Sequence, residues 1–463
     1  MNFFKENFNK KKSSIPDPRE ILKNQVVKRG TCVGCGSCVS IIGGKMNYTN
    51  DGVKPEFADG PINKDLSNLA IEACPGLGIH YPNLYREHYG SVPENWLLGK
   101  SINTRISYSN NEKIRGVSAS GGVITQTLVY LLERGYVDAV ILVKQGLKIP
   151  ERAEYFIAKN KEEIISCSQS VYVPVSMLDA LTCLEKDKKY AITCLPEQAA
   201  SLRVMQSKNF PPALQIKYIL GPYTGTSILP SSIRALLKSN GIKDNDQIIS
   251  LKWRAGDWPG YLEVRLSSGE VVRSKKVYYN FLIPFYITNT SLQSIDFYNE
   301  FSDLSVGDAW SPKYEKIGKG FSVVTTRSTE IEDILKEMID KKLISSEPID
   351  KFKASEMHGH MLDFKKRGSH IRNRWRTLLG KSAPNNGILV NHIGFKRYLV
   401  ELLISIVFII CRTRLSRAIL TFFPENIIGP FFNALRLSWK NMTKPTKRKG
   451  LANLDISEVS KEK

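Results

Sequence analysis

Cys32-Val33-Gly34-Cys35-Gly36-Ser37-Cys38 places three cysteines at even spacing, and Cys74-Pro75 follows downstream. Three thiolates from a C-x2-C-x2-C run and a fourth from a distant Cys-Pro are the ligand pattern of a ferredoxin 4Fe-4S cluster. A second cluster would need another Cys-Pro soon after Cys38, where the chain has Ile42-Gly43. The pattern therefore predicts one cluster, held by Cys32, Cys35, Cys38 and Cys74.

Small residues separate the three closely spaced thiols. Gly34, Gly36 and Ser37 allow the backbone to wrap closely and to direct amide N–H groups at the sulfurs, which tunes the potential of a cluster. A structural zinc site is the alternative. Four-cysteine zinc sites usually have two separated C-x2-C pairs rather than a triple and a single cysteine, so the spacing favours the cluster and leaves zinc as the second interpretation.

Length and composition indicate a folded protein with two or three domains. The chain has 463 residues, of which 42% are hydrophobic and 10% aromatic, and these values exclude a disordered or fibrous protein. Eight cysteines and an Asn- and Lys-rich start argue against a secreted disulfide scaffold. We expect a cytoplasmic protein.

Positive charge is concentrated near the C-terminus. Twenty Lys and Arg and four acidic residues lie between Lys351 and Lys449, so this segment carries sixteen of the net +21 charges. Two apolar stretches, Tyr398 to Cys411 and Ile427 to Trp439, lie inside it. The first is fourteen residues long and contains Glu401, which makes it too short and too polar for a confident membrane span.

The basic, apolar tail favours an anionic membrane surface as a partner, and no nucleic acid is expected, because the positive charge is interleaved with aliphatic runs. We expect helices in the interface plane, which would make the protein peripheral on the inner face of the cell membrane. The aromatic residues expected to reach the acyl chains are Phe422, Phe423, Phe431, Phe432 and Trp439. The alternative is an amphipathic helical hairpin packed on the protein or on a partner.

Apolar periodicity indicates an α+β or α/β fold in the middle of the chain. Helical spacing covers Gly122 to Glu133 and Ser231 to Ser239. The predicted organisation is a basic N-terminal arm over 1–28, a small ferredoxin-like 4Fe-4S domain over 29–85, a mixed α/β domain over 100–345 and a helical basic tail over 350–463. Strands are expected at Val137–Val143, Tyr190–Thr193, Ile216–Leu220, Ile249–Trp253, Leu262–Leu266 and Ser322–Thr326.

Several motifs between about Gly30 and Arg327 occur in a characteristic order. After the cysteines come Val117 to Val123, Tyr172-Val173-Pro174, Glu197 to Arg203, Trp253-Arg254, Trp258-Pro259-Gly260 and Asp303 to Trp310. Together they resemble the beta subunit of coenzyme F420-reducing hydrogenases and dehydrogenases, a family of flavin and iron-sulfur proteins. The chain departs from that pattern at Pro196-Glu197-Gln198, where the family usually has Pro-Cys-Gln.

The resemblance implies that the domain over 100–345 binds FAD. The residues themselves are compatible with this, because a Ser/Gly stretch that opens a helix offers hydroxyl and amide donors to a phosphate. A plain serine N-cap is the alternative for that stretch, and a surface stacking pair is the alternative for Arg254 beside Trp258. The candidate cofactor-binding residues are Ser118, Ser120, Gly121, Gly122, Tyr172, Gln198, Arg254 and Asp308.

The function implied is that of an enzyme, a flavin- and iron-sulfur-dependent oxidoreductase that passes electrons between the cluster, FAD and an organic donor or acceptor. The organic donor or acceptor would be a deazaflavin-like compound, a lipid-linked or surface-polysaccharide substrate, or a quinone. The partner would be a redox protein or an organic electron carrier. No catalytic residue is assigned. The alternative is a non-catalytic electron-transfer module docked to a membrane-associated complex.

Overall fold

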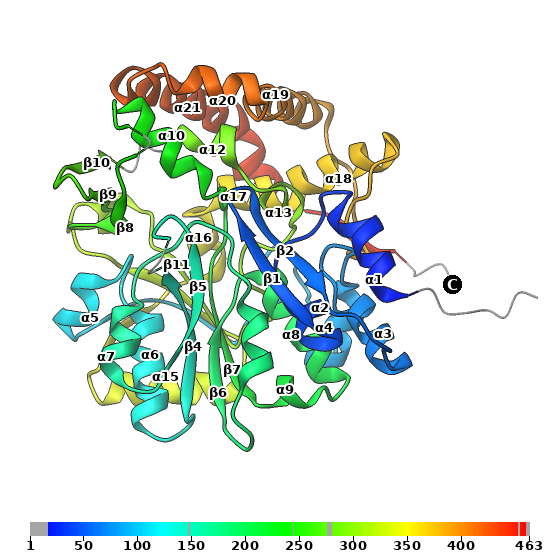
Figure 1. The fold of residues 1–463 in the computed structure, drawn as a ribbon. Helices are drawn as coiled ribbons and strands as arrows, with labels where there is room; N and C mark the ends of the chain where they lie inside the picture. The colour runs from blue at the N-terminus through cyan, green and yellow to red at the C-terminus, as the bar shows by residue number, and fades with distance from the viewer. Residues whose placement is uncertain (1–16, 147–148, 244, 276–279, 452–453, 460–463) are drawn as a thin grey trace, which may run out of the picture.

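A computed structural model describes residues 17–146, 149–243, 245–275, 280–451 and 454–459, and its central feature is a mixed eight-stranded sheet (Figure 1). The strands are β3 Asn103–Ser109, β4 Ala139–Gln145, β5 Ala153–Ala158, β6 Tyr190–Thr193, β7 Ile216–Pro222, β11 Leu304–Asp308, β12 Ser322–Thr326 and β13 Ile344–Pro348. Their order is β13-β3-β12-β11-β7-β6-β4-β5. The pairs β4–β6, β6–β7 and β7–β11 are parallel, whereas the outer pairs are antiparallel. The mixed α/β fold expected from the sequence is confirmed.

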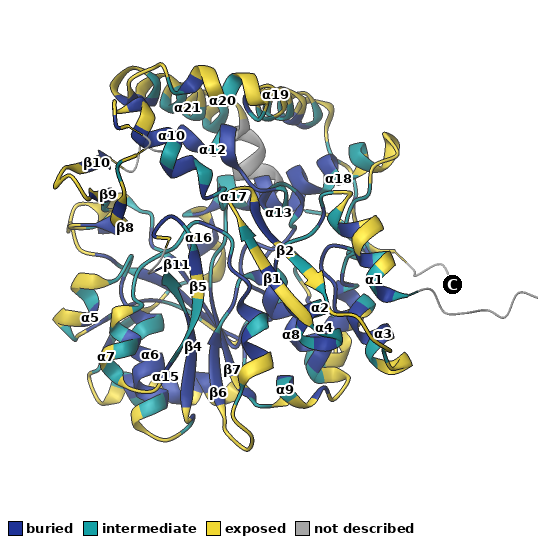
Figure 2. Cartoon of the chain, viewed as in Figure 1, coloured by how far each residue is buried: buried dark blue, intermediate teal, exposed yellow. Residues whose placement is uncertain are grey.

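The parallel strands are buried on both faces. Val140 and Leu142 of β4 enter one hydrophobic core, whereas Ala139 and Ile141 of the same strand enter another. Successive side chains of a strand point to opposite faces, so a strand covered on both sides is apolar throughout. This burial, which Figure 2 shows in dark blue along much of β4 and β6, explains why the sequence here is a continuous aliphatic run rather than an alternating one.

Helices cover the two faces of the sheet (Figure 1). On one face Leu128, Ile164 and Leu335 anchor three helices to the core. On the other face Leu202 of a longer helix packs together with the cysteine-bearing segment. The first face carries α5 Glu112–Val117, α6 Val123–Glu133, α7 Lys161–Ser166 and α15 Thr329–Asp340, and the second carries η2 Met177–Cys183, α8 Pro196–Ser207 and α9 Pro211–Leu214.

The cysteine-bearing segment is a small helical unit with one hairpin. Residues 1–16 of the expected basic arm lie outside the described residues, and the rest of the arm forms two short helices. The elements are α1 Pro18–Ile21, η1 Leu22–Val27, α2 Ser37–Ile42, β1 Gly44–Thr49, β2 Gly52–Phe57, α3 Lys64–Glu72 and α4 Tyr81–Tyr89. The strands β1 and β2 pair in antiparallel fashion. The expected ferredoxin-like fold of this segment stays a prediction.

A second, three-stranded antiparallel sheet lies beside the large one, in the order β10-β9-β8. It follows α10, which confirms the helix expected at Ser231–Ser239. A cis peptide bond joins Trp258 to Pro259 between β8 and β9. The elements are α10 Ser231–Ser239, β8 Ile248–Ala255, β9 Tyr261–Leu266, β10 Val271–Lys275, α12 Leu282–Tyr286, α13 Asn289–Gln293 and α14 Pro312–Glu315.

The tail is helical, as expected, and forms a layer over α10, α12 and α17 (Figure 1). Its last described strand pairs with β14. Among the described residues, no helix combines the length and the apolar composition that a membrane span needs. The elements are α16 Lys351–Glu356, α17 Gly359–Asp363, η3 Phe364–Gly368, α18 Ser369–Leu378, β14 Ile388–Val390, α19 Phe395–Cys411, α20 Arg414–Leu420, α21 Glu425–Gly450 and β15 Ile456–Glu458.

Candidate cofactor sites

The four predicted cluster ligands line one pocket. Cys32 and Cys35 come from the loop that precedes α2, Cys38 lies in the first turn of α2, and Cys74 follows the end of α3. Ala73, beside Cys74, accepts hydrogen bonds from the hydroxyls of Ser37 at 3.4 Å and of Ser201 in α8 at 2.6 Å. These bonds hold the distant cysteine against the triple and tie both to the large sheet.

Glycine is required where this loop passes under a neighbouring helix. Gly36 has a φ of 89°, and a Cβ there would lie 2.5 Å from the backbone nitrogen of Asp179 in η2. Gly34, with a φ of 69°, would place a Cβ 3.0 Å from the carbonyl oxygen of Val53. The small residues between the cysteines therefore serve close backbone packing as well as left-handed conformations.

Burial and mutual repulsion disfavour charge on the four thiols. Burial raises the pKa of all four, that of Cys74 to about 12, and the neighbouring sulfurs raise the pKa of Cys38 and Cys35 further. Hydrogen bonds from backbone amides act in the opposite direction and lower these pKa values. The donors are the amides of Gly34, Ser37, Val39, Gly76 and Leu77.

Within the described residues, no group of three or more His, Cys, Asp or Glu side chains could hold a metal ion. The zinc alternative would need four thiolates at a single ion. A 4Fe-4S cluster takes one thiolate at each of four irons, so its ligands surround a larger group. Four thiols around one pocket, each facing backbone N–H donors, fit such a group, and the ligand set stays a prediction.

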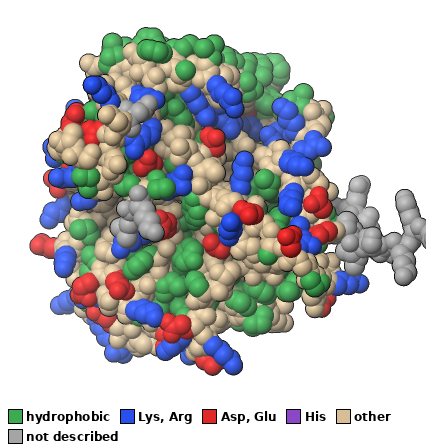
Figure 3. All heavy atoms as spheres, in the orientation of Figure 1, with side chains coloured by type: hydrophobic (Ala, Val, Ile, Leu, Met, Phe, Trp, Pro, Cys, Tyr) green, Lys and Arg blue, Asp and Glu red, His purple; other side chains and the backbone are tan. Residues whose placement is uncertain are grey.

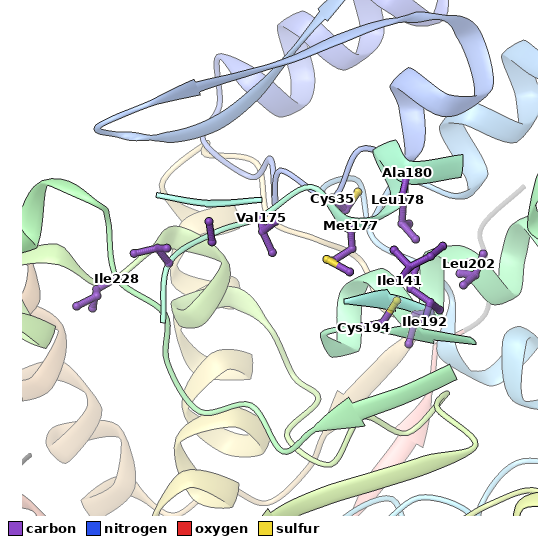
Figure 4. Packing of buried hydrophobic residues seen from close by; sticks show 14 of the residues in the cluster. Cys35, Ile141, Val175, Met177, Leu178, Ala180, Ile192, Cys194, Leu202 and Ile228 are labelled. Carbon is purple, nitrogen blue, oxygen red and sulfur yellow. The ribbon is translucent and has the colours of Figure 1, made fainter. Parts of the chain in front are cut away.

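One extended segment connects this pocket to the edge of the large sheet. Leu178 donates its amide to the carbonyl of Cys35 at 2.9 Å, and the hydroxyls of Ser176 and Tyr48 lie 2.6 Å apart. Figure 4 shows Val175, Met177 and Leu178 following one another toward Cys35. The segment starts at Tyr172, which belongs to a second group of predicted residues.

That second group is centred on Arg254, whose guanidinium is buried. It donates to the carboxylate of Asp308 at 3.2 Å, to the hydroxyl of Tyr172 at 3.2 Å and to the carbonyl of Ala119 at 2.7 Å. Asp308 ends β11, and the parallel strands of the sheet end at the same edge. Ligands of open α/β sheets bind at this edge. Arg254 is not the surface stacking residue of the alternative interpretation.

The Ser/Gly loop lies at the same edge, but its hydroxyls bind the protein. Ser118 donates to the carbonyl of Ile114 at 2.7 Å, and Ser120 to that of Phe321 at 2.7 Å. Gly122, with a φ of 76°, is the N-cap of α6 and has no side-chain cap. The plain serine N-cap is therefore wrong, and the first turn of α6 presents amides without a capping side chain.

Gln198 does not join this group. Its amide oxygen accepts the backbone N–H of Leu195 at 2.9 Å, and its amide nitrogen donates to the carbonyl of Val175 at 2.8 Å. It caps the start of α8 and holds the segment that leads to Cys35. The prediction of a cofactor contact at Gln198 has no support in this geometry, because both ends of the amide bind the backbone.

The sequence interpretation missed two contributors at the Arg254 site. The carbonyls of Ala119 and Pro259 accept from the guanidinium, and backbone carbonyls carry no side-chain signature in a sequence. It also missed Trp258 and Trp310, whose ring centroids lie 4.8 Å apart. The indole nitrogen of Trp258 is buried and has no hydrogen-bond partner among the described residues. The family motifs containing these tryptophans were the available signal.

Comparisons with known proteins agree with the order of the motifs. Residues 106–182 match the model of the coenzyme F420 hydrogenase/dehydrogenase beta subunit N-terminus, and residues 187–352 match that of its C terminus. The coenzyme F420-dependent sulfite reductase of Methanocaldococcus jannaschii is 25% identical over 71% of this chain. The coenzyme F420 hydrogenase subunit beta of Methanosarcina barkeri is 22% identical over 55% of this chain.

This chain covers a different share of the length of each relative. It spans 49% of the sulfite reductase and 85% of the hydrogenase subunit. In a solved structure of the F420-reducing NiFe hydrogenase complex from Methanosarcina barkeri, one chain aligns with a TM-score of 0.49 and 18% identity. That alignment covers 64% of this chain and 99% of the other.

Proposed function

We propose, from the premise that this chain belongs to the coenzyme F420 hydrogenase/dehydrogenase beta subunit family, that it is an iron-sulfur flavoprotein oxidoreductase. The observation that carries the proposal is the pocket lined by four cysteine thiols. The relatives named above are F420-dependent sulfite reductase and F420 hydrogenase, both oxidoreductases. The electrons would pass between one 4Fe-4S cluster, FAD and an organic donor or acceptor.

The cysteine pocket suits a cluster in its electrostatics. Cys32, Cys35, Cys38 and Cys74 would hold the group, which supplies one-electron transfer when bound. The protein contributes backbone N–H donors toward the sulfurs and buries Cys35 and Cys74. Both features set the potential of an iron-sulfur centre. Because the pKa values of these thiols are raised, a bound cation or cluster is needed to stabilise the negative charge of the thiolates.

The Arg254 site suits the anionic part of a flavin nucleotide. It combines a buried guanidinium with two groups that lack a partner within the described residues: the helix-start amides, which have no capping side chain, and the indole N–H of Trp258. Donors of these kinds bind phosphates and carbonyl oxygens. Asp308 orients Arg254 by its ion pair at 3.2 Å. FAD, when bound, supplies the exchange between one-electron and two-electron chemistry.

The two sites are joined by a short stretch of backbone. Only five residues lie between Tyr172, which contacts Arg254, and Leu178, which contacts Cys35. Gln198 and Tyr48 hold this stretch by hydrogen bonds. The arrangement supports a relay within one chain, with a deazaflavin-like, quinone or lipid-linked substrate as the organic partner and a redox protein as a further partner.

Anaerobic purification with iron, sulfide and FAD quantified together tests the proposal. We expect about four iron and four sulfide per chain and bound FAD. Arg254→Gln should weaken FAD binding by at least about tenfold, because a charge-assisted bond to an anion contributes on the order of 1.5–3 kcal/mol. Iron content should not change. Arg265→Gln on the exposed side of β9 is the control, since Arg265 pairs with Glu263 away from this site.

The outcomes separate the candidate functions. Iron and sulfide without FAD would contradict the enzyme and leave the alternative, a non-catalytic electron-transfer module. Absence of iron from anaerobically prepared protein would contradict both. FAD that binds equally to the Arg254→Gln variant would contradict the placement of the flavin site but not the cluster.

A further inference from the structure

The tail layer exposes a broad apolar face. Phe422 is 82% exposed, Phe395 75% and Ile409 69%, whereas Cys411 and Leu420 of the same layer are buried in the core. Figure 3 shows hydrophobic side chains gathered along the top of the molecule, over α19 to α21. The exposed apolar members are Phe395, Leu399, Leu402, Leu403, Ile406, Val407, Ile409, Ile410, Leu415, Ile419, Phe422, Phe423, Ile427, Phe431, Leu435, Leu437 and Met442.

Buried ion pairs fix the orientation of α19, so that this face cannot turn inward. Glu401 lies within the apolar run and is fully buried, where it forms an ion pair with Arg397 at 2.8 Å and accepts a hydrogen bond from Arg372 of α18. Arg397 also pairs with Asp363 at 2.9 Å. Separating such buried charges is costly. The aliphatic side chains on the opposite side of α19 are therefore held toward the exterior.

The other two helices are anchored by a hydrogen bond and by aromatic packing. Arg417 of α20 donates to the carbonyl of Phe285 at 2.9 Å, and Phe432 of α21 packs on the ring of Phe285. Trp439 contacts Phe364. Phe432 and Trp439, which the sequence interpretation placed at the acyl chains, therefore face the protein. Phe422, Phe423 and Phe431 remain exposed.

Within the tail, the exposed charge beside this face is positive. Between Ser369 and Met442 the acidic residues are Glu401 and Glu425, and both are buried. Lys396 and Arg414, at the starts of α19 and α20, are exposed. In Figure 3 Lys and Arg side chains lie just below the apolar band. An apolar face above a basic rim is the pattern of helices that lie in the interface of an anionic bilayer.

We propose that α19, α20 and α21 dock this protein on the surface of an anionic lipid bilayer, with the helices in the plane of the interface. None of the described helices is long and apolar enough to span it, which agrees with this mode of attachment. A second copy of the chain is a poorer occupant. A two-fold interface would bring the same basic rims together, and like charges across an interface are unfavourable.

Vesicle flotation with the anaerobically purified full chain tests this docking. We expect flotation with vesicles of phosphatidylglycerol and phosphatidylcholine, and much less with phosphatidylcholine alone. Replacing Leu403, Ile409, Phe422 and Phe431 by Ser should weaken binding by at least about a hundredfold, because buried apolar area drives such binding. These side chains are exposed, so the fold and the iron content should be preserved.

Two further variants make the test specific. Replacing four exposed apolar residues elsewhere, Ile102, Leu214, Ile249 and Ile317, by Ser should leave binding unchanged. Lys396→Gln with Arg414→Gln should reduce the preference for anionic vesicles. The proposal would be overturned by a chain that floats with neither vesicle or by a face variant that still floats. A lipid-free dimer that the face variant converts to monomers would also overturn it.

Discussion

Two clusters of buried ionisable side chains differ in how their charges balance. The cysteine pocket collects four groups that can only become negative, and the thiols raise one another's pKa. Beneath α19, the carboxylates of Glu401 and Asp363 contact the guanidiniums of Arg372 and Arg397. Burial alone would raise the pKa of Glu401, but Arg372 and Arg397 hold it below its usual value.

The difference separates a binding site from a structural anchor. Opposite charges in contact offset each other, so the carboxylates of Glu401 and Asp363 are balanced by the guanidiniums of Arg372 and Arg397. Ionised thiols in contact repel one another, and a bound cation or metal cluster removes this repulsion. Charge balance therefore distinguishes a candidate cofactor site from a buried salt-bridge network when both are equally well packed.

The largest expected effect comes from removing one thiol of the pocket. Cys74→Ala should lower the iron and sulfide bound per chain by at least about tenfold, because the cluster loses one of four ligands. Cys194→Ala is the matched control, because Cys194 is a buried thiol whose pKa is raised mainly by burial and in part by Cys35 but which does not line the pocket. Equal iron in both variants would contradict the assignment.

A smaller effect is expected from the structural anchor. Glu401→Gln leaves buried guanidiniums without their carboxylate and should lower the free energy of unfolding by about 3–5 kcal/mol. Glu347→Gln is the control, because its pair with Lys313, 3.0 Å long, is exposed and contributes about 1 kcal/mol or less. Urea denaturation of both variants gives the comparison, and similar losses would mean that the buried network is not an anchor.

The smallest expected effect is a pH dependence of the cluster-free protein. The folded thiols have pKa values above the ordinary value of 9.0, so the folded state keeps protons that the unfolded state releases. Stability is then fully present below about pH 9 and falls as the pH rises, by about 1.4 kcal/mol per pH unit for each such thiol.

Denaturation of the cluster-free protein at several alkaline pH values measures this slope. The Cys74→Ala variant should show a shallower fall, because one raised pKa, about 12 in the folded chain, has been removed. A slope that is unchanged in the variant would contradict burial of Cys74 as a protonated thiol.

Local patterns predicted most of the sheet and its covering helices. Tyr190–Thr193, Ser322–Thr326 and Ser231–Ser239 were predicted with the bounds that the structure has. Apolar runs and caps act within a few residues, so a sequence shows them directly. The strand expected at Val137–Val143 is found two residues later, at Ala139–Gln145, since Val137 packs in the turn that precedes it.

Long-range contacts were beyond the sequence. The sequence grouped Arg254, Asp308 and Tyr172 through the family resemblance alone, and it gave no sign that they contact one another or that Gln198 caps α8 instead of joining them. The i,i+4 spacing of Arg397 and Glu401 was a usable signal for a helical ion pair, but the part played by Asp363 and Arg372 was not visible.

The amino-acid sequence alone therefore established three properties of the chain: four cysteines at the spacing of a cluster site, a mixed α/β core and a basic, apolar tail. The tertiary structure decided which groups share a site and which face of α19 points outward. The physical reason is that thiolate spacing and helical periodicity are properties of neighbouring residues, whereas burial and charge pairing depend on segments that the fold brings together.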